Sequence, residues 1–260
     1  MKYSIVTTTV RGIEKLMPFF ITPSEDAELI IVPKSRDEQV LEFLKKQSGF
    51  AQIVYPEPHL VYHYPTDIQQ CRNTGIMYAE GERVILMDDS IELKKDLWDK
   101  LDEAVKCFPN HIILFQKLHE VLGERKWINV FSTRQNKMMQ RYYFINDPQY
   151  TLNFGAVRLA DILAVNGIDI IYDAGQQWYE DTLLLAHLIR KGVRVVYDTH
   201  CMGYKFAHPE FMPPFRANKW LYDVDIERCR CGCTWAYNPY SIQVLREEKL
   251  KEKEKWIVSN

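Results

Sequence analysis

RVILMDD, residues 83–89, is the stretch that decides the predicted fold. Its apolar run, Val84 to Met87, is bounded by charge at both ends, which is typical of a strand buried on both faces of a sheet. Asp88 and Asp89 follow where this strand leaves the core, and open α/β sheets bind their ligands at that edge. We therefore expect both carboxylates to lie at a ligand site.

A second acidic pair, Glu180 and Asp181, stands about ninety residues further along the chain. It opens the amphipathic stretch 182–191, so we expect both residues near the N-terminus of a helix, where negative charge is stabilised. Two carboxylate sites on one sheet edge indicate a metal site and a general base.

Strand and helix patterns alternate along the chain. The predicted strands are residues 3–8, 27–32, 52–55, 83–87, 111–115, 152–156 and 193–197, and the predicted helices are 35–47, 67–79, 93–107, 159–165, 182–191 and 240–256. This order predicts an α/β fold with a mostly parallel central sheet and helices on both faces. Residues 202–218 contain three prolines and are predicted to form an ordered loop.

The composition is that of a globular protein with one large α/β domain, or a domain with an elaborated tail. The chain has 260 residues, of which 47% are hydrophobic, and its net charge is -2. This charge gives no electrostatic footprint for nucleic acid. The N-terminal residues lack the apolar core of a signal peptide, and no run reaches the about 18 apolar residues of a membrane span, so we expect a cytoplasmic protein.

Three of the six cysteines, Cys229, Cys231 and Cys233, are crowded together. Structural zinc sites favour ligand pairs separated by two to four residues, whereas here single residues separate the cysteines. We expect reduced thiols, with zinc as the alternative.

Several segments resemble the GT-A glycosyltransferases, especially the inverting family-2 type with its DxD and ED motifs. The matching segments are residues 72–75, 79–83, 85–89, 153–155, 166–169, 178–184 and 191–192. The resemblance covers about residues 3 to 200. It implies a Rossmann-like GT-A catalytic domain over residues 1–200, and we expect residues 201–260 to form a C-terminal loop and helical extension packed on the same domain.

The resemblance implies transfer of a sugar from a nucleotide-diphosphate sugar to an acceptor hydroxyl, by a single displacement with inversion. Asp181 would be the general base, and Glu180 would orient the acceptor. The expected donor-binding residues are Thr7, Thr8, Arg11, Arg72, Asp88, Asp89 and Trp178. Each of these residues also has a purely structural interpretation. Asp88 and Asp89 could form a turn after a strand, and Glu180 and Asp181 could cap a helix. The threonines could reflect strand propensity, Arg72 could lie on a solvated helix face, and Trp178 could pack in the core.

A divalent metal ion, Mn²⁺ or Mg²⁺, is the cofactor that the resemblance implies. Its expected ligands are Asp89, Ser90, His200 and His208. Ser90 stands where the family has a carboxylate, and Glu92 is a substitute two residues on. This departure leaves a metal-weak or metal-free variant open.

The sequence supports three alternative functions less well than glycosyl transfer. A non-catalytic nucleotide-sugar-binding module is favoured by Ser90, and a nucleotidyltransferase would require more than the one glycine found in residues 7–15. A dinucleotide-dependent oxidoreductase is disfavoured, since no GxGxxG follows the first strand. The acceptor is a saccharide hydroxyl or, as the second choice, a nucleic acid contacted by the basic, aromatic stretch 125–143. The motifs leave the nucleotide and the sugar open.

Overall fold

The computed structural model describes residues 2–9, 24–33, 38–47, 51–54, 68–121, 124–126, 140–146, 152–170, 180–205, 224–228, 236, 238 and 241–258. Its strands are β1 (Tyr3–Thr9), β2 (Ala27–Pro33), β3 (Ala51–Ile53), β4 (Arg83–Asp88), β5 (Ile91–Leu93), β6 (His111–Val121), β7 (Glu124–Lys126), β8 (Tyr142–Ile145), β9 (Phe154–Arg158) and β10 (Arg194–Lys205). Its helices are α1 (Glu38–Gln47), α2 (Ile68–Tyr78), α3 (Leu97–Cys107), α4 (Leu159–Ala164), α5 (Glu180–Arg190) and α7 (Ile242–Val258).

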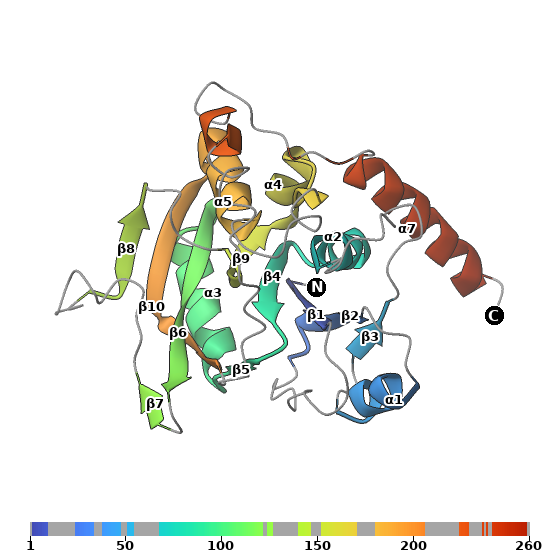
Figure 1. Cartoon of the computed structure of the whole chain (residues 1–260), viewed down its shortest axis with the longest axis horizontal. Helices are drawn as coiled ribbons and strands as arrows, with labels where there is room; N and C mark the ends of the chain where they lie inside the picture. Colours follow the sequence, from blue (N-terminus) through green and yellow to red (C-terminus); the bar gives the residue numbers. More distant parts are fainter. Residues whose placement is uncertain are drawn as a thin grey trace.

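The strands form one sheet in the order β3-β2-β1-β4-β9-β6-β10-β5, with β7 paired to β6 and β8 paired to β10. Figure 1 shows this sheet spread from β8 and β10 at one side to β2 and β3 at the other. β3, β2, β1 and β4 are parallel to one another, as are β6 and β10, and the antiparallel β9 joins the two groups. The predicted α/β fold is confirmed.

Two apolar layers, one on each face of the sheet, form the core. Alternate residues of one strand supply both layers, as Ile85 and Leu86 of β4 illustrate. α2, α4, α5 and α7 cover the Leu86 face, and α1 and α3 cover the Ile85 face. This double cover explains why β4 reads as a continuous apolar run instead of an alternating one.

Two strands extend beyond their predicted ends. β6 continues past Phe115, and β10 continues to Lys205, where its last three residues pair with β5. Leu93 belongs to β5, so the predicted helix 93–107 is wrong at its start, and α3 begins at Leu97. Gly203 permits this pairing, because a Cβ there would lie 2.6 Å from the ring of Phe154. Of the predicted loop 202–218, residues 206–218 lie outside the described part.

A left-handed turn joins α4 to the rest of the chain and fixes the position of α7. Asn166 and Gly167 have φ of 63° and 74°. The Asn73 side chain of α2 bonds to the backbone N–H and C=O of Ile168, at 2.9 and 2.7 Å. Asn166 Oδ1 accepts the N–H of Ile242 at the start of α7, at 2.9 Å. The described helices include none with the length and apolar character needed to cross a bilayer.

Candidate functional site

The carboxyl ends of β1 and β4 lie side by side. Asp88, the last residue of β4, is the register partner of Thr8 on β1. Thr7 is buried, and its hydroxyl has no hydrogen-bond partner, whereas Thr8 is partly buried. The sheet thus places the predicted donor residues Thr7, Thr8 and Asp88 at one edge, as expected for parallel neighbours.

Asp88 is paired with two cations from distant parts of the chain. Arg72 of α2 donates to Oδ1 at 3.2 Å, and Lys205 at the end of β10 donates to Oδ2 at 2.9 Å. Burial would raise the pKa of Asp88, but the charges of Lys205, Arg72 and Lys117 outweigh burial and hold this pKa well below its usual range. Asp88 is therefore ionised near neutral pH, and each of its oxygens accepts a hydrogen bond from a cation.

Lys117 of β6 is a third cation at this edge. Its ammonium group donates a hydrogen bond to Asn153 Oδ1 just before β9. Burial lowers the pKa of Lys117 to about 8, while the charges of Asp88 and Asp181 oppose this shift. Lys117 thus lies within electrostatic range of both acidic sites that the sequence predicts, one at the end of β4 and one at the start of α5.

Asp181 lies in the first turn of α5 and is buried, with 7% of its surface exposed. Its Oδ1 accepts the backbone N–H of Thr182 at 2.8 Å. Glu180 is the first residue of α5.

The remaining predicted residues fall into two groups. Arg11, Trp178 and His208 lie outside the described residues, as do Cys229, Cys231 and Cys233. Asp89 and Ser90 follow Asp88 and are buried, at 7% and 1% exposure, and the Ser90 hydroxyl has no hydrogen-bond partner.

His200 is exposed and lies in an irregular part of β10, where the register with β6 shifts between Asp198 and Met202. Its backbone N–H donates to Asp198 Oδ1 at 2.8 Å. His200 stays a predicted metal ligand.

The described residues do not fit the implied metal ion. They contain no group of three His, Cys, Asp or Glu side chains placed to hold a cation. A hard divalent ion requires several oxygen ligands, yet the oxygens of Asp88 are occupied by Lys205 and Arg72, and Ser90 supplies only a buried neutral hydroxyl.

Arg141, from the basic stretch considered for nucleic-acid binding, has a structural role. It donates to both oxygens of the fully buried Asp198, at 3.1 Å each, and to Glu103 of α3. Its guanidinium group also lies 4.8 Å from the ring centroid of Tyr142. These contacts join β8, β10 and α3.

Lys117 and Lys205 are the site residues that sequence reasoning missed. Both lie beyond the predicted limits of their strands: Lys205 ends β10, and Lys117 lies within β6, which continues to Val121. The signal that would have found Lys117 is its position two residues after the apolar run 112–115, at the same edge as Asp88.

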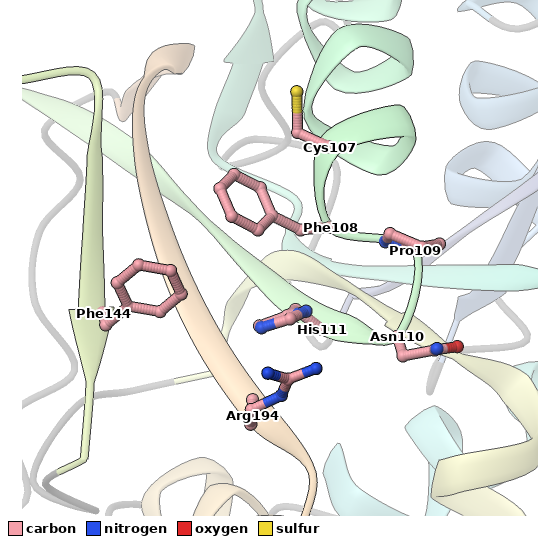
Figure 2. A pocket seen from close by; sticks show the side chains of 7 residues that line it. All are labelled: Cys107, Phe108, Pro109, Asn110, His111, Phe144 and Arg194. Carbon is pink, nitrogen blue, oxygen red and sulfur yellow. The ribbon is translucent and has the colours of Figure 1, made fainter.

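A small cavity of about 290 Å³ lies at the opposite edge of the sheet, where β6 and β10 begin. Figure 2 shows its lining, which is Cys107, Phe108, Pro109, Asn110, His111, Phe144 and Arg194. Both ring nitrogens of His111 are buried and without a hydrogen-bond partner. This cavity holds no carboxylate and is separate from the Asp88 site.

Comparison with protein-family models and with curated proteins found no match. Solved structures do match. S. aureus TarS 1–349 in complex with UDP is 15% identical with a TM-score of 0.62, and the match covers 80% of this chain and 61% of that chain. GalNAc-T7 with UDP, GalNAc and Mn²⁺ is 14% identical with a TM-score of 0.63, and the match covers 87% of this chain and 47% of that chain.

These neighbours are GT-A glycosyltransferases, so the fold of this chain is a GT-A glycosyltransferase fold. The match spans about 61% of the length of TarS 1–349 and 47% of GalNAc-T7.

Proposed function

We propose that this protein is a glycosyltransferase that moves a sugar from a nucleotide-diphosphate sugar to an acceptor hydroxyl. The observation that carries the proposal is that the charges of Asp88 and Asp181 both act on Lys117, with Asp88 at the carboxyl edge of a GT-A sheet. Asp88 ends a central strand, and Asp181 begins a helix. Both neighbours were solved with UDP, which supports a nucleotide donor.

The proposed chemistry is a single displacement with inversion, as in the family-2 type. The acceptor oxygen forms a bond to the anomeric carbon while the bond from that carbon to the β-phosphate oxygen breaks. Asp181 takes the proton of the acceptor hydroxyl, and the nucleoside diphosphate leaves with the electron pair. Glu180 orients the acceptor, and since no step forms a covalent enzyme intermediate, one carboxylate base suffices.

The donor lies along the carboxyl edge of β1 and β4. The donor residues that we propose come from several elements. Thr7 and Thr8 lie near the end of β1, and Arg11 follows this strand in the sequence. Arg72 lies in α2 beside Asp88, Asp89 follows β4, and Trp178 is the proposed wall of the sugar pocket. Residues 1–200 form the catalytic domain and 201–260 its extension, which the contact of Arg246 in α7 with the Met77 carbonyl of α2 supports. Because the described residues do not fit a metal ion, no step is assigned to one.

A catalytically inactive nucleotide-sugar-binding module is the second candidate, and Ser90 is the observation that favours it. The acceptor that we propose is a saccharide hydroxyl. A nucleic-acid acceptor has less support, because Arg141 is held by Asp198 and Glu103.

A thermal-shift screen tests the proposal. The purified chain is heated with UDP-, GDP-, dTDP- and CMP-sugars, since a ligand that binds only the native state raises the melting temperature. We expect one nucleotide class to stabilise the protein, and on incubation with saccharide acceptors we expect the nucleotide to be released from the matching donor as its sugar is transferred. Stabilisation without any turnover would favour the binding module, and stabilisation by none of the donors would contradict both candidates.

A further inference from the structure

The charge around Asp88 is unlike that of a cation site. Three basic groups act on this carboxylate: Arg72 and Lys205 by direct ion pairs of 3.2 and 2.9 Å, and Lys117 through its charge. They come from α2, β10 and β6, which are far apart in the sequence. A metal ion placed here would face these three positive charges and compete with two of them for the oxygens of Asp88.

The same groups form a site for an anion. Arg72 is largely buried, with 8% of its side chain exposed, whereas Lys205 is 21% exposed and so retains access from solvent. Ion pairs and hydrogen bonds in such a partly dry environment are stronger than at an open surface. A guanidinium and two ammonium groups suit the several oxygens of a diphosphate. The Arg72 guanidinium is held in position by hydrogen bonds to Gln69 Oε1 and Asp88 Oδ1, at 3.2 Å each.

We propose that Arg72, Lys117 and Lys205 bind the diphosphate of the donor and neutralise the leaving nucleoside diphosphate in place of a divalent metal ion. This inference rests on the proposed function. When the bond from the anomeric carbon to the phosphate oxygen breaks, that oxygen gains negative charge, and fixed cations stabilise this charge without having to be recruited. Asp88 holds Arg72 and Lys205 in place for this role, and Ser90 is accounted for, since no metal ligand is needed at that position.

Nucleotide binding with and without metal distinguishes this inference from the proposed function. The protein is titrated by calorimetry with UDP, GDP and dTDP, once in excess EDTA and once with Mn²⁺. We expect one nucleotide to bind in EDTA and in Mn²⁺ with affinities that differ by less than about tenfold, which corresponds to 1.4 kcal/mol. Binding that requires Mn²⁺ would overturn the inference and leave the proposed function standing. Binding of no nucleotide in either condition would overturn the proposed function and the inference with it.

Variants then assign the binding to these side chains. In EDTA, Lys205→Met and Lys117→Met should each weaken nucleotide binding about tenfold or more, because each removes a charge-assisted contact. Lys205→Arg keeps the charge and should recover most of the affinity, which guards against a loss due to misfolding. Lys106→Met is the matched control, since this exposed lysine ends α3 at the opposite edge of the sheet. Unchanged affinity in both methionine variants would overturn the inference.

Discussion

Asp88 and Asp181 are both carboxylates near Lys117, but their neighbours give them different chemistry. Both oxygens of Asp88 accept bonds from cations, which makes Asp88 a poor proton acceptor. Asp181 accepts a backbone N–H through Oδ1 at the start of α5. This contrast supports Asp181 over Asp88 for the proposed role of general base.

Asp181→Asn should abolish most of the transfer while leaving the donor bound. An amide cannot take the acceptor proton, so we expect kcat to fall by about 10²–10⁴. The dissociation constant of the nucleotide, measured by calorimetry, should change by no more than about twofold, because the base acts in the transition state. Asp161→Asn is the control, since Asp161 pairs with Arg158 at the opposite edge. Full turnover by Asp181→Asn would refute the assignment.

Nucleotide affinity should fall as the pH rises above 8, because the pKa of Lys117 is about 8. The charged groups that act on Lys117 are Asp88, Lys205, Asp181 and Arg72. Once Lys117 is neutral, each further pH unit should weaken binding by up to about tenfold. Calorimetry from pH 7 to 9 measures this, and Lys117→Arg should remove the decline. An equal decline in that variant would contradict the prediction.

At the scale of elements, the junction of α2, the turn at Gly167 and α7 depends on one buried amide. Asn73 is fully buried and satisfies both the N–H and the C=O of Ile168. Asn73→Ala should lower stability by about 2–3 kcal/mol, since it removes two buried hydrogen bonds and leaves the Ile168 N–H unpaired, whereas the Ile168 carbonyl keeps the Asn238 amide at 3.2 Å. For a chain of this size the melting temperature should then drop by about 4–10 °C.

Nucleotide affinity separates a structural role of Asn73 from a role in donor binding. We expect Asn73→Ala to bind nucleotide as the wild type does at 15 °C, where both are folded. Gln243→Ala is the control for stability, since the amide of Gln243 bonds only across the exposed face of α7, to Glu247 at 3.2 Å. A normal melting temperature with weakened nucleotide binding would place Asn73 in the donor site.

The sequence predicts best those elements whose signal is local. β4 is predicted because strands covered on both faces are continuously apolar, and α2 is predicted because Asp67 is a favourable N-cap residue. β5 was missed, since its three residues form a strand only by pairing with Gly203 to Lys205, more than a hundred residues away. The length of β10 depends on the same contact.

The candidate site follows the same rule. Asp88 and Asp181 were located because each stands at the end of an element, a position that the sequence reveals. Lys205 was not located, because its importance comes from an ion pair with Asp88 across 117 positions. Lys117 carries no motif of its own, and only the arrangement of β4, β9 and β6 brings it to this edge.

At the scale of the whole molecule, Asp88 ties together three regions of the chain, since it ends β4 and pairs with α2 and β10. Its pKa lies below the ordinary value of 3.8 in the folded protein. The folded state therefore binds fewer protons at Asp88 than the unfolded state does, so this contribution to stability is complete above about pH 4 and is lost as the pH falls further.

Asp88→Asn should consequently be less stable than the wild type by about 2–3 kcal/mol at pH 6, because it leaves Arg72 and Lys205 without their anion. Below pH 4 the wild type loses this advantage progressively, so the difference in unfolding free energy should narrow by about 1 kcal/mol at pH 3. Urea unfolding at pH 6, 4 and 3 measures the difference, with Asp99→Asn on the exposed side of α3 as the control. A gap that stays constant from pH 6 to 3 would mean that the ion pairs of Asp88 do not contribute to the stability of the fold.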